Sequence, residues 1–335
     1  MSFQVAQRIL LAVGLVCGAT APVLAQDEEP RNYIMATAQD GGTYYPVGVA
    51  MAVLSTIHLQ PSFGFDIEAV TSGGSLDNLR LMRDGDAQFG MLEVLAGTWA
   101  RDGTGPLAEI GPQDNLRAIT MLWPDVEHFL ISTALAETGT IADLAGLAGR
   151  GFAMGPLGSG TEYTNTLLFE NFGFDYASWG IVHQTYEQSA QALLDGTIAG
   201  VNIGSGVGVN TVHSVMTQMG DLLTLLSVTD EQAAALDGGL GILSTTLIPP
   251  GTYPGIEAPL QTVSLPNFLS VNADVPAEDV YEFTRVLFEN LEYLCGVHQA
   301  ACALSLDGAQ NGLPVDLHPG AARYFREMGM EASDP

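Results

Sequence analysis

The chain has 335 residues, 47% of them hydrophobic, and carries 38 acidic residues against ten Arg and no Lys, for a formal net charge of −28. A chain of this length can bury the cores of two lobes. The negative charge argues against nucleic acid or an anionic membrane surface as a partner, because both require a basic face. Most of the acidic residues are expected on a solvated surface.

Residues 1–25 have the pattern of a secretory signal peptide. Arg8 provides a positive start, 9–16 form an apolar run, and small residues precede a cleavage site after Ala25. Lipidation at Cys17 is the second interpretation, because Val16 stands where a small residue is expected. We therefore expect an exported, periplasmic protein.

The first part of the chain alternates short strands with helices. Strands are expected at 33–36, 65–70 and 87–92. The first intervening helix has an apolar face made by Val47, Met51, Leu54 and Ile57. The second is expected to be capped by Ser75 and to end at Gly85. This order is typical of a parallel, doubly wound α/β sheet.

The pattern restarts after residue 115. Further strands are expected at 116–122, 128–132, 151–155, 198–204 and 262–271, with helices at 141–147, around 190–194 and at 280–294. No low-complexity linker divides these units, so the chain is expected to cross between two lobes in extended strands. One lobe would comprise 26–125 plus about 246–335, and the other about 126–245. Two such lobes form a cleft that can close on a ligand.

Three glycine-rich turns each follow an expected strand and open an expected helix. They are Gly41 to Tyr44, Ser72 to Ser75, and Gly158 to Thr161. Helix N-termini offer unpaired N–H groups and a partial positive charge, so they hold anions without Lys or Arg. Ordinary helix capping is the alternative for any single turn. Three turns around one cleft favour a small carboxylate, and sulfate or phosphate remain physically allowed.

Four segments in register resemble the TAXI family, the periplasmic solute-binding receptors of one branch of the TRAP transporters. They are GGTYYPVGVAMA (41–52), TSGGSLDNLRLMRDGDAQFGM (71–91), GPLGSGTE (155–162) and LHPGAARYFREMG (317–329). The resemblance implies a two-lobed periplasmic-binding-protein fold of type II character. It also implies a monomer without a cofactor, which captures a small anionic solute, a carboxylate or amino acid, and delivers it to TRAP membrane permease subunits.

Carried over by position, the resemblance places ligand-facing residues in the three turns. These are Gly42, Thr43, Tyr44, Gly74, Ser75, Gly158, Ser159, Gly160 and Thr161. Glu93 and Ser205 stand where this chain departs from the family pattern, and they are expected to set the rest of the specificity. The dicarboxylate ligands common in the family are therefore not carried over with the binding role.

Three interpretations of Glu93 stay open. An ionised carboxylate in the cleft would repel a second ligand carboxylate and favour an amino group, a hydroxyl or a neutral end. Burial could instead raise its pKa, so that it donates a hydrogen bond. Alternatively, Glu93 faces solvent. Of Tyr44 and Tyr45, one is expected at the ligand and the other in the core, while Trp123 is expected under the hinge rather than on the cleft wall.

Cys295 and Cys302 remain after signal cleavage and are expected to form a structural disulfide rather than a reactive dithiol. Seven residues apart on one unbroken helix they would lie about 10 Å from each other, so pairing requires a break near 296–298. The six His are scattered without ligand spacing, which argues against a metal site and suggests surface or capping roles.

Two other functions compete with the binding role. A secreted serine hydrolase would need Ser inside G-x-S-x-G, and Ser159 lacks that spacing. A ligand-sensing partner of a signalling receptor would use the same cleft and differ only in what the closed form contacts. We expect a binding protein and not an enzyme.

Overall fold

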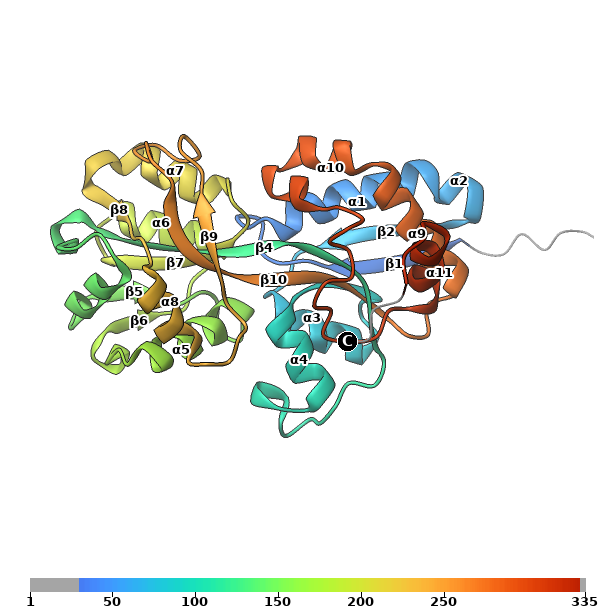
Figure 1. The fold of residues 1–335 in the computed structure, drawn as a ribbon, viewed down its shortest axis with the longest axis horizontal. Coiled ribbons are helices and arrows are strands. Elements are labelled where there is room, and N and C mark those ends of the chain that lie inside the picture. The colour runs from blue at the N-terminus through green and yellow to red at the C-terminus, as the bar shows by residue number, and fades with distance from the viewer. Residues whose placement is uncertain (1–29, 332–335) are drawn as a thin grey trace, which may run out of the picture.

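The computed structural model describes residues 30–331, so the predicted signal peptide lies outside the described residues. Figure 1 shows two bodies side by side, joined by two long strands, β4 (Leu116–Ser132) and β10 (Leu260–Asn272). One mixed sheet runs through both bodies in the order β2-β1-β3-β10-β4-β7-β5-β6, with β8 added to β4 and β9 to β10. The fold is therefore α/β as expected. Its sheet is not wholly parallel, because β10 is antiparallel to β3 and β4.

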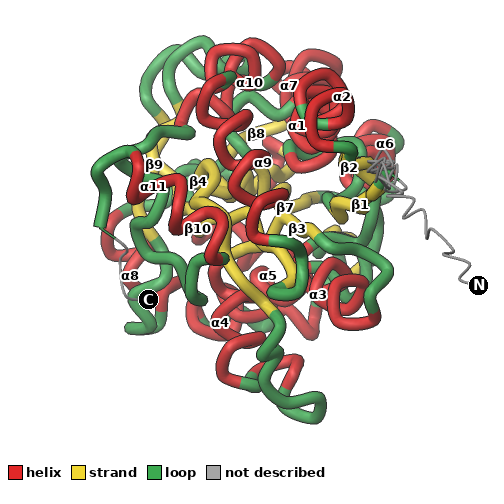
Figure 2. Tube along the Cα trace, turned by 90° about the vertical axis from the view of Figure 1, so that its right-hand side faces the viewer, coloured by secondary structure: helices red, strands yellow, loops and turns green. Residues whose placement is uncertain are grey.

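The first body is built from both ends of the described chain. Its elements are β1 (Arg31–Ala36), α1 (Tyr44–His58), α2 (Gln60–Phe63), β2 (Phe65–Val70), α3 (Ser75–Asp84), β3 (Phe89–Glu93), α4 (Val94–Asp102), α9 (Ala277–Glu289), α10 (Leu291–Val297) and α11 (Pro319–Glu327). Strand β1 pairs in parallel with β2 and β3. The end view in Figure 2 shows α1, α9 and α10 on one side of the strands and α3 and α4 on the other.

The second body comes from the middle of the chain. Its elements are β5 (Gly151–Ala153), α5 (Gly160–Phe172), β6 (Gly180–Val182), α6 (Tyr186–Leu194), β7 (Gly200–Ser205), α7 (Asn210–Met219), β8 (Leu223–Leu225), α8 (Asp230–Asp237) and β9 (Ser244–Ile248). Strand β7 pairs in parallel with β5 and antiparallel with β4.

Each body has its own apolar core. Two clusters of buried side chains, one around Phe89 and Phe283 and one around Leu92 and Phe268, belong to the first body. Two others, around Val201 and around Phe152, belong to the second. We refer to the two bodies as lobes 1 and 2, and the residue limits given above for them stay a prediction.

Several predicted elements differ from the structure. Strands 116–122 and 128–132 are one strand, β4, in which Pro124 lies opposite Pro266 of β10, so neither proline removes a donor that the other strand needs. Segment 141–147 forms a 3-10 helix. The helix expected over 280–294 breaks at Asn290, whose side chain donates to the Val286 carbonyl at 2.8 Å.

One predicted core position is wrong. Val47, Met51 and Leu54 are buried on α1, but Ile57 is 59% exposed. Ile57 lies at four-residue spacing from Val49 and Val53, which are also exposed, so it belongs to the outer side of α1 and not to its buried face.

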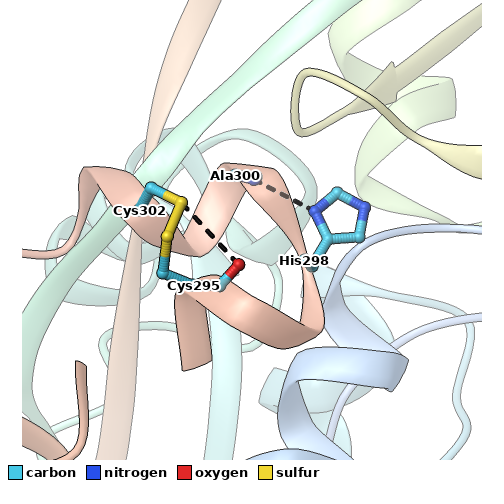
Figure 3. The surroundings of a disulfide bond; sticks show 4 residues. All are labelled: Cys295, His298, Ala300 and Cys302. Carbon is cyan, nitrogen blue, oxygen red and sulfur yellow. Dashed lines mark hydrogen bonds between the residues drawn. A yellow bond between two sulfur atoms is a disulfide. The ribbon is translucent and has the colours of Figure 1, made fainter. Parts of the chain in front are cut away.

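The structure joins Cys295 to Cys302, with the Cα atoms 4.4 Å apart (Figure 3). Helix α10 stops at Val297, and a 3-10 helix follows over Gln299–Ala303. His298 adopts an extended backbone between them, and its Nδ1 accepts the N–H of Ala300 at 3.1 Å. The break brings the two sulfur atoms together. Among residues 30–331, each helix is too short or too polar to cross a bilayer.

Candidate ligand-binding site

The three glycine-rich turns meet at one cavity between the lobes. The space open to the centre of a water molecule is about 40 Å³, enough for a few waters. The lining residues are Ala38, Gln39, Gly42, Thr43, Tyr44, Gly73, Gly74, Ser75, Glu93, Asp125, Gly160, Thr161, Tyr186, Gly204 and Ser205. Of the predicted ligand-facing residues, nine therefore surround this cavity, and Gly158 and Ser159 do not.

The second and third turns leave backbone donors at the cavity. Within the described chain, no acceptor is seen for the N–H groups of Ser75 at the start of α3 or of Gly160 and Thr161 at the start of α5. Gly74 precedes α3 with φ of 99°, a conformation that favours glycine. Since these donors open helices of ten and thirteen residues, they offer partial positive charge to an anion.

Three of the turn residues have structural roles. Ser75 was expected to cap α3, but it is the first helical residue, and its Oγ accepts the Glu93 N–H at 3.1 Å. Ser159 caps α5 by accepting the Glu162 N–H at 3.1 Å. The Gly158 N–H donates to the Glu162 carboxylate, which holds this turn closed behind the cavity.

Hydrogen bonds join the lobes around the cavity, so the structure represents a closed state. The Ser205 Oγ of lobe 2 accepts the Thr43 N–H at 3.1 Å and lies 2.9 Å from Thr43 Oγ1. The Thr164 hydroxyl donates to Glu93 at 2.8 Å, and the Tyr186 N–H donates to the Gln39 amide oxygen at 2.6 Å.

Three buried carboxylic acids make one side of this region acidic. Glu93 at the end of β3 and Asp125 on β4 line the cavity, and each is 6% exposed. Glu127, two residues further along β4, is 2% exposed and accepts a hydrogen bond from Asn202. Among the described residues that line the cavity, none is Arg, Lys or His.

Burial raises the pKa values of all three carboxylic acids. Burial raises the pKa of Glu93, while the Thr164 hydroxyl opposes that rise. Burial, helped by the negative charges of Glu93 and Glu127, raises the pKa of Asp125 well above its usual range. Burial raises the pKa of Glu127 to about 8. Desolvation dominates in each case, and like charge adds to it at Asp125 and Glu127.

Comparison with known protein families shows the family to which the chain belongs. The sequence model of the NMT1-like family matches residues 35–329. This chain belongs to the NMT1-like family.

Solved structures share the fold of this NMT1-like protein. MatC from Rhodopseudomonas palustris, solved with bound malate, is 13% identical with a TM-score of 0.55, over 89% of this chain and 97% of that one. The periplasmic binding protein BugD is 15% identical with a TM-score of 0.52, over 90% and 95% of the two chains. A protein from Bordetella bronchiseptica RB50 is 12% identical with a TM-score of 0.50, over 88% and 82%. The fold is thus the two-lobed one of periplasmic binding proteins.

The aromatic residues near the cavity of this NMT1-like protein are held by packing and by a hydrogen bond. Tyr44 is 7% exposed, lines the cavity and donates from its hydroxyl to Asn267 Oδ1 at 2.6 Å, whereas Tyr45 is half-buried. Trp123 is 1% exposed and packs edge-on against Tyr44, with ring centroids 6.2 Å apart. It is therefore a core residue beneath the lobe junction and does not line the cavity.

One histidine departs from its expected surface or capping role. His128 is fully buried on β4, with Nδ1 2.8 Å from the Ile203 carbonyl and Nε2 2.8 Å from the Tyr253 hydroxyl. Burial lowers its pKa to about 4, so the ring is neutral. It ties β7 to the Tyr253 segment and does not reach the cavity. In residues 30–331, no three His, Cys, Asp or Glu side chains are grouped to hold a metal ion.

Sequence reasoning missed Asp125, Tyr186 and Gln39 at the site. Asp125 and Glu127 do carry a signal, because two acidic residues two positions apart in an otherwise apolar strand point to the same side of the sheet. Tyr186 and Gln39 carry no such signal, since they reach the cavity only through the packing of one lobe on the other.

Proposed function

We propose that this NMT1-like protein is the periplasmic solute-binding receptor of a TRAP-type transporter of the TAXI kind. It captures a small organic acid or amino acid between its lobes and delivers it to a membrane permease. The TAXI assignment rests on the four sequence segments given above. The receptor role is supported by the two-lobed fold and the enclosed cavity at the lobe junction.

One observation carries the choice of ligand class. Three helix N-termini, from α1, α3 and α5, face the same cavity, and the N–H groups of Ser75, Gly160 and Thr161 have no acceptor within the described chain. A carboxylate would accept from these donors without any Lys or Arg. MatC, a protein of the same fold, was solved with malate, which makes organic acids the first class to examine.

Binding would act through closure. Lobe 1 supplies Thr43, Ser75 and Glu93, and lobe 2 supplies Gly160 and Ser205, so a ligand completes its contacts only when both lobes surround it. A ligand shifts the open–closed equilibrium by its difference in affinity for the two states. The closed form would then be the one that the permease recognises.

A thermal-shift screen tests this proposal. The protein exported to and purified from the periplasm of an expression host is heated with organic acids, amino acids, inorganic anions and, as a control, neutral sugars. A ligand that binds only the folded protein raises the melting temperature in proportion to the logarithm of its excess over Kd.

We expect a shift with one group of carboxylates or amino acids. A shift only with neutral solutes would overturn the helix N-terminal carboxylate site, and no shift with any small solute would overturn the receptor function. Delivery is tested separately, by uptake of the identified ligand in source cells with and without this gene.

A further inference from the structure

Two glycines lie next to the carboxylates of Glu93, Asp125 and Glu127, and their lack of side chains leaves space beside these oxygen atoms. A side-chain carbon on Gly160 would lie 2.8 Å from Glu93 Oε1. A side-chain carbon on Gly204 would lie 3.3 Å from both Asp125 Oδ2 and Glu127 Oε2. Any larger residue at either position would crowd these oxygen atoms, so the glycines leave Glu93 and Asp125 open to what enters the cavity and let Glu127 lie close behind them.

Asp125 is the least satisfied of the three. Thr164 donates to Glu93, and Asn202 donates to Glu127. No described group donates to Asp125 with ordinary hydrogen-bond geometry. The Asn267 amide is near enough to lower the pKa of Asp125, yet its Nδ2 is itself left without a hydrogen-bond partner. A carboxylate that is 94% buried thus faces the cavity without a good donor.

The two neighbouring tyrosine hydroxyls do not supply that donor. Tyr44 gives its proton to Asn267 Oδ1, and Tyr186 gives its proton to the Gly204 carbonyl, each at 2.6 Å. Buried carboxylates are costly unless they are paired and hydrogen-bonded. Among the described lining residues there is no basic group to pair them, so protonation keeps them neutral in the empty protein and a ligand cation is what would hold them ionised.

We infer that the ligand carries a protonated amine, which donates to Asp125 and Glu93 while Glu127 adds negative charge from behind. This inference rests on the proposed function and deepens it. The ligand carboxylate would meet the free N–H groups of Ser75, Gly160 and Thr161, and its ammonium the acidic side. The substrate class is then a small amino acid, and dicarboxylates are disfavoured because their second carboxylate would face three acids.

Calorimetric titration with matched pairs of ligands tests the inference on the purified protein. Each pair shares a carbon skeleton: an α-amino acid and the corresponding 2-hydroxy acid, together with the dicarboxylates malate and succinate. We expect the amino acid of the best pair to bind about 10- to 100-fold more tightly than its hydroxy acid, the range for hydrogen bonds to charged groups.

The outcomes separate the two proposals. Equal or tighter binding of the hydroxy acid or of a dicarboxylate would overturn the amine inference and leave the receptor function standing. Binding of Ca²⁺ or Zn²⁺ with no binding of any amino acid would overturn it as well. Failure of every ligand would overturn both.

Variants of the acidic residues test whether they are the groups that recognise the amine. Asp125→Asn keeps the shape of the side chain, and we expect it to weaken amino-acid binding about 10- to 100-fold while hydroxy-acid binding is held or improved. Glu93→Gln serves as a second variant should Asp125→Asn fail to fold. Glu289→Gln, an exposed acid on α9, is the control and should bind like the parent. An equal loss for both members of the pair would show a merely structural role and contradict the inference.

Discussion

The titration of single residues makes the stability of the ligand-free protein depend on pH. Glu127 has a pKa of about 8 in the folded protein, against about 4.5 when exposed, because it is buried. The folded protein therefore binds more protons than the unfolded one between these values. Stability is greatest below the lower pKa and is lost as pH rises through the upper one.

Histidine acts in the opposite sense at the lower end of this window. Burial lowers the pKa of His128 to about 4 and also lowers the pKa values of His298 and His318, so these rings take up protons on unfolding near pH 6.5 and below. This effect fades as pH rises toward 8, where the loss of stability through Glu127 prevails.

We expect ligand-free protein to lose about 1.5 kcal/mol of unfolding free energy between pH 6.5 and 8 through Glu127 alone. Glu127→Gln can still accept from Asn202 but cannot ionise, so it should flatten the slope and be the more stable protein at pH 8. Urea unfolding at a series of pH values measures this, with the exposed Glu289→Gln as control. Parallel slopes for Glu127→Gln and the parent would refute the burial argument.

A single hydroxyl connects the lobes at Ser205. Its Oγ accepts the Thr43 N–H and contacts Thr43 Oγ1. Each such bond contributes about 0.5–1.5 kcal/mol, and here only in the closed state. Ser205→Ala should weaken ligand binding roughly 5- to 30-fold with little change in the stability of the empty protein. The matched control is Ser214→Ala, an exposed serine on α7, and equal affinities for the two variants would rule out the role of Ser205.

At the scale of elements, the 3-10 helix Gln299–Ala303 of lobe 1 meets the end of β7 in lobe 2. A side-chain carbon on Gly206 would lie 2.3 Å from the Ala300 Cβ and 3.1 Å from Thr43 Oγ1. Overpacking of this kind costs about 1–3 kcal/mol, and it arises only when the lobes approach.

Gly206→Ala should therefore disfavour closure while leaving each lobe folded. We expect ligand affinity to fall roughly 5- to 100-fold and the melting temperature of the empty protein to stay close to that of the parent. Calorimetry and thermal melting measure the two quantities. Gly146→Ala is the control, because a side chain there meets open space. Unchanged affinity in Gly206→Ala would mean that the closed contact does not form on binding.

The disulfide holds the same 3-10 helix in place. Cys295 and Cys302 are seven residues apart, and closing a loop of this size is worth about 2–3 kcal/mol in the chain-entropy description. We expect reduction, or the Cys295→Ser and Cys302→Ser pair, to lower the melting temperature by roughly 5 °C. Thiol titration first confirms that the bond is present. An unchanged melting temperature would show that this segment unfolds separately from the lobes.

Element prediction succeeded where periodicity is local. Strand β2 matches 65–70, and Gly85 ends α3 in the left-handed conformation. It failed where tertiary contacts decide. The strands expected at 116–122 and 128–132 are one strand, in which Pro124 lies opposite Pro266, and periodicity does not reveal that pairing. The Ser75 hydroxyl accepts the N–H of Glu93 on β3, so the prediction that it caps α3 is wrong.

At the scale of the whole molecule, the order of strands and turns predicted two lobes and the meeting of three helix starts, because βα turns of one sheet end at the same edge. The acidic side of the cavity was predicted only at Glu93. Asp125 and Glu127 reach it because β4 runs unbroken from one lobe to the other, so the middle of this strand lies at the cleft. That placement is a property of the assembled sheet.

The cavity is lined by residues of both lobes, so binding requires the lobes to come together. Both walls of the cavity are needed for a complete site, and the lobes touch through Thr43 and Ser205 and through Glu93 and Thr164 only when closed. The empty protein is expected to spend most of its time open, because closure covers the three acids without a ligand to pair with them.

Small-angle X-ray scattering, with and without a saturating amino acid identified by calorimetry, tests this closure most directly. We expect a smaller radius of gyration on binding, a scattering curve that matches the closed structure, and a smaller change for Gly206→Ala at the lowest ligand concentration that saturates the parent. A radius of gyration that stays the same with ligand bound would contradict a receptor that works by closing around its solute.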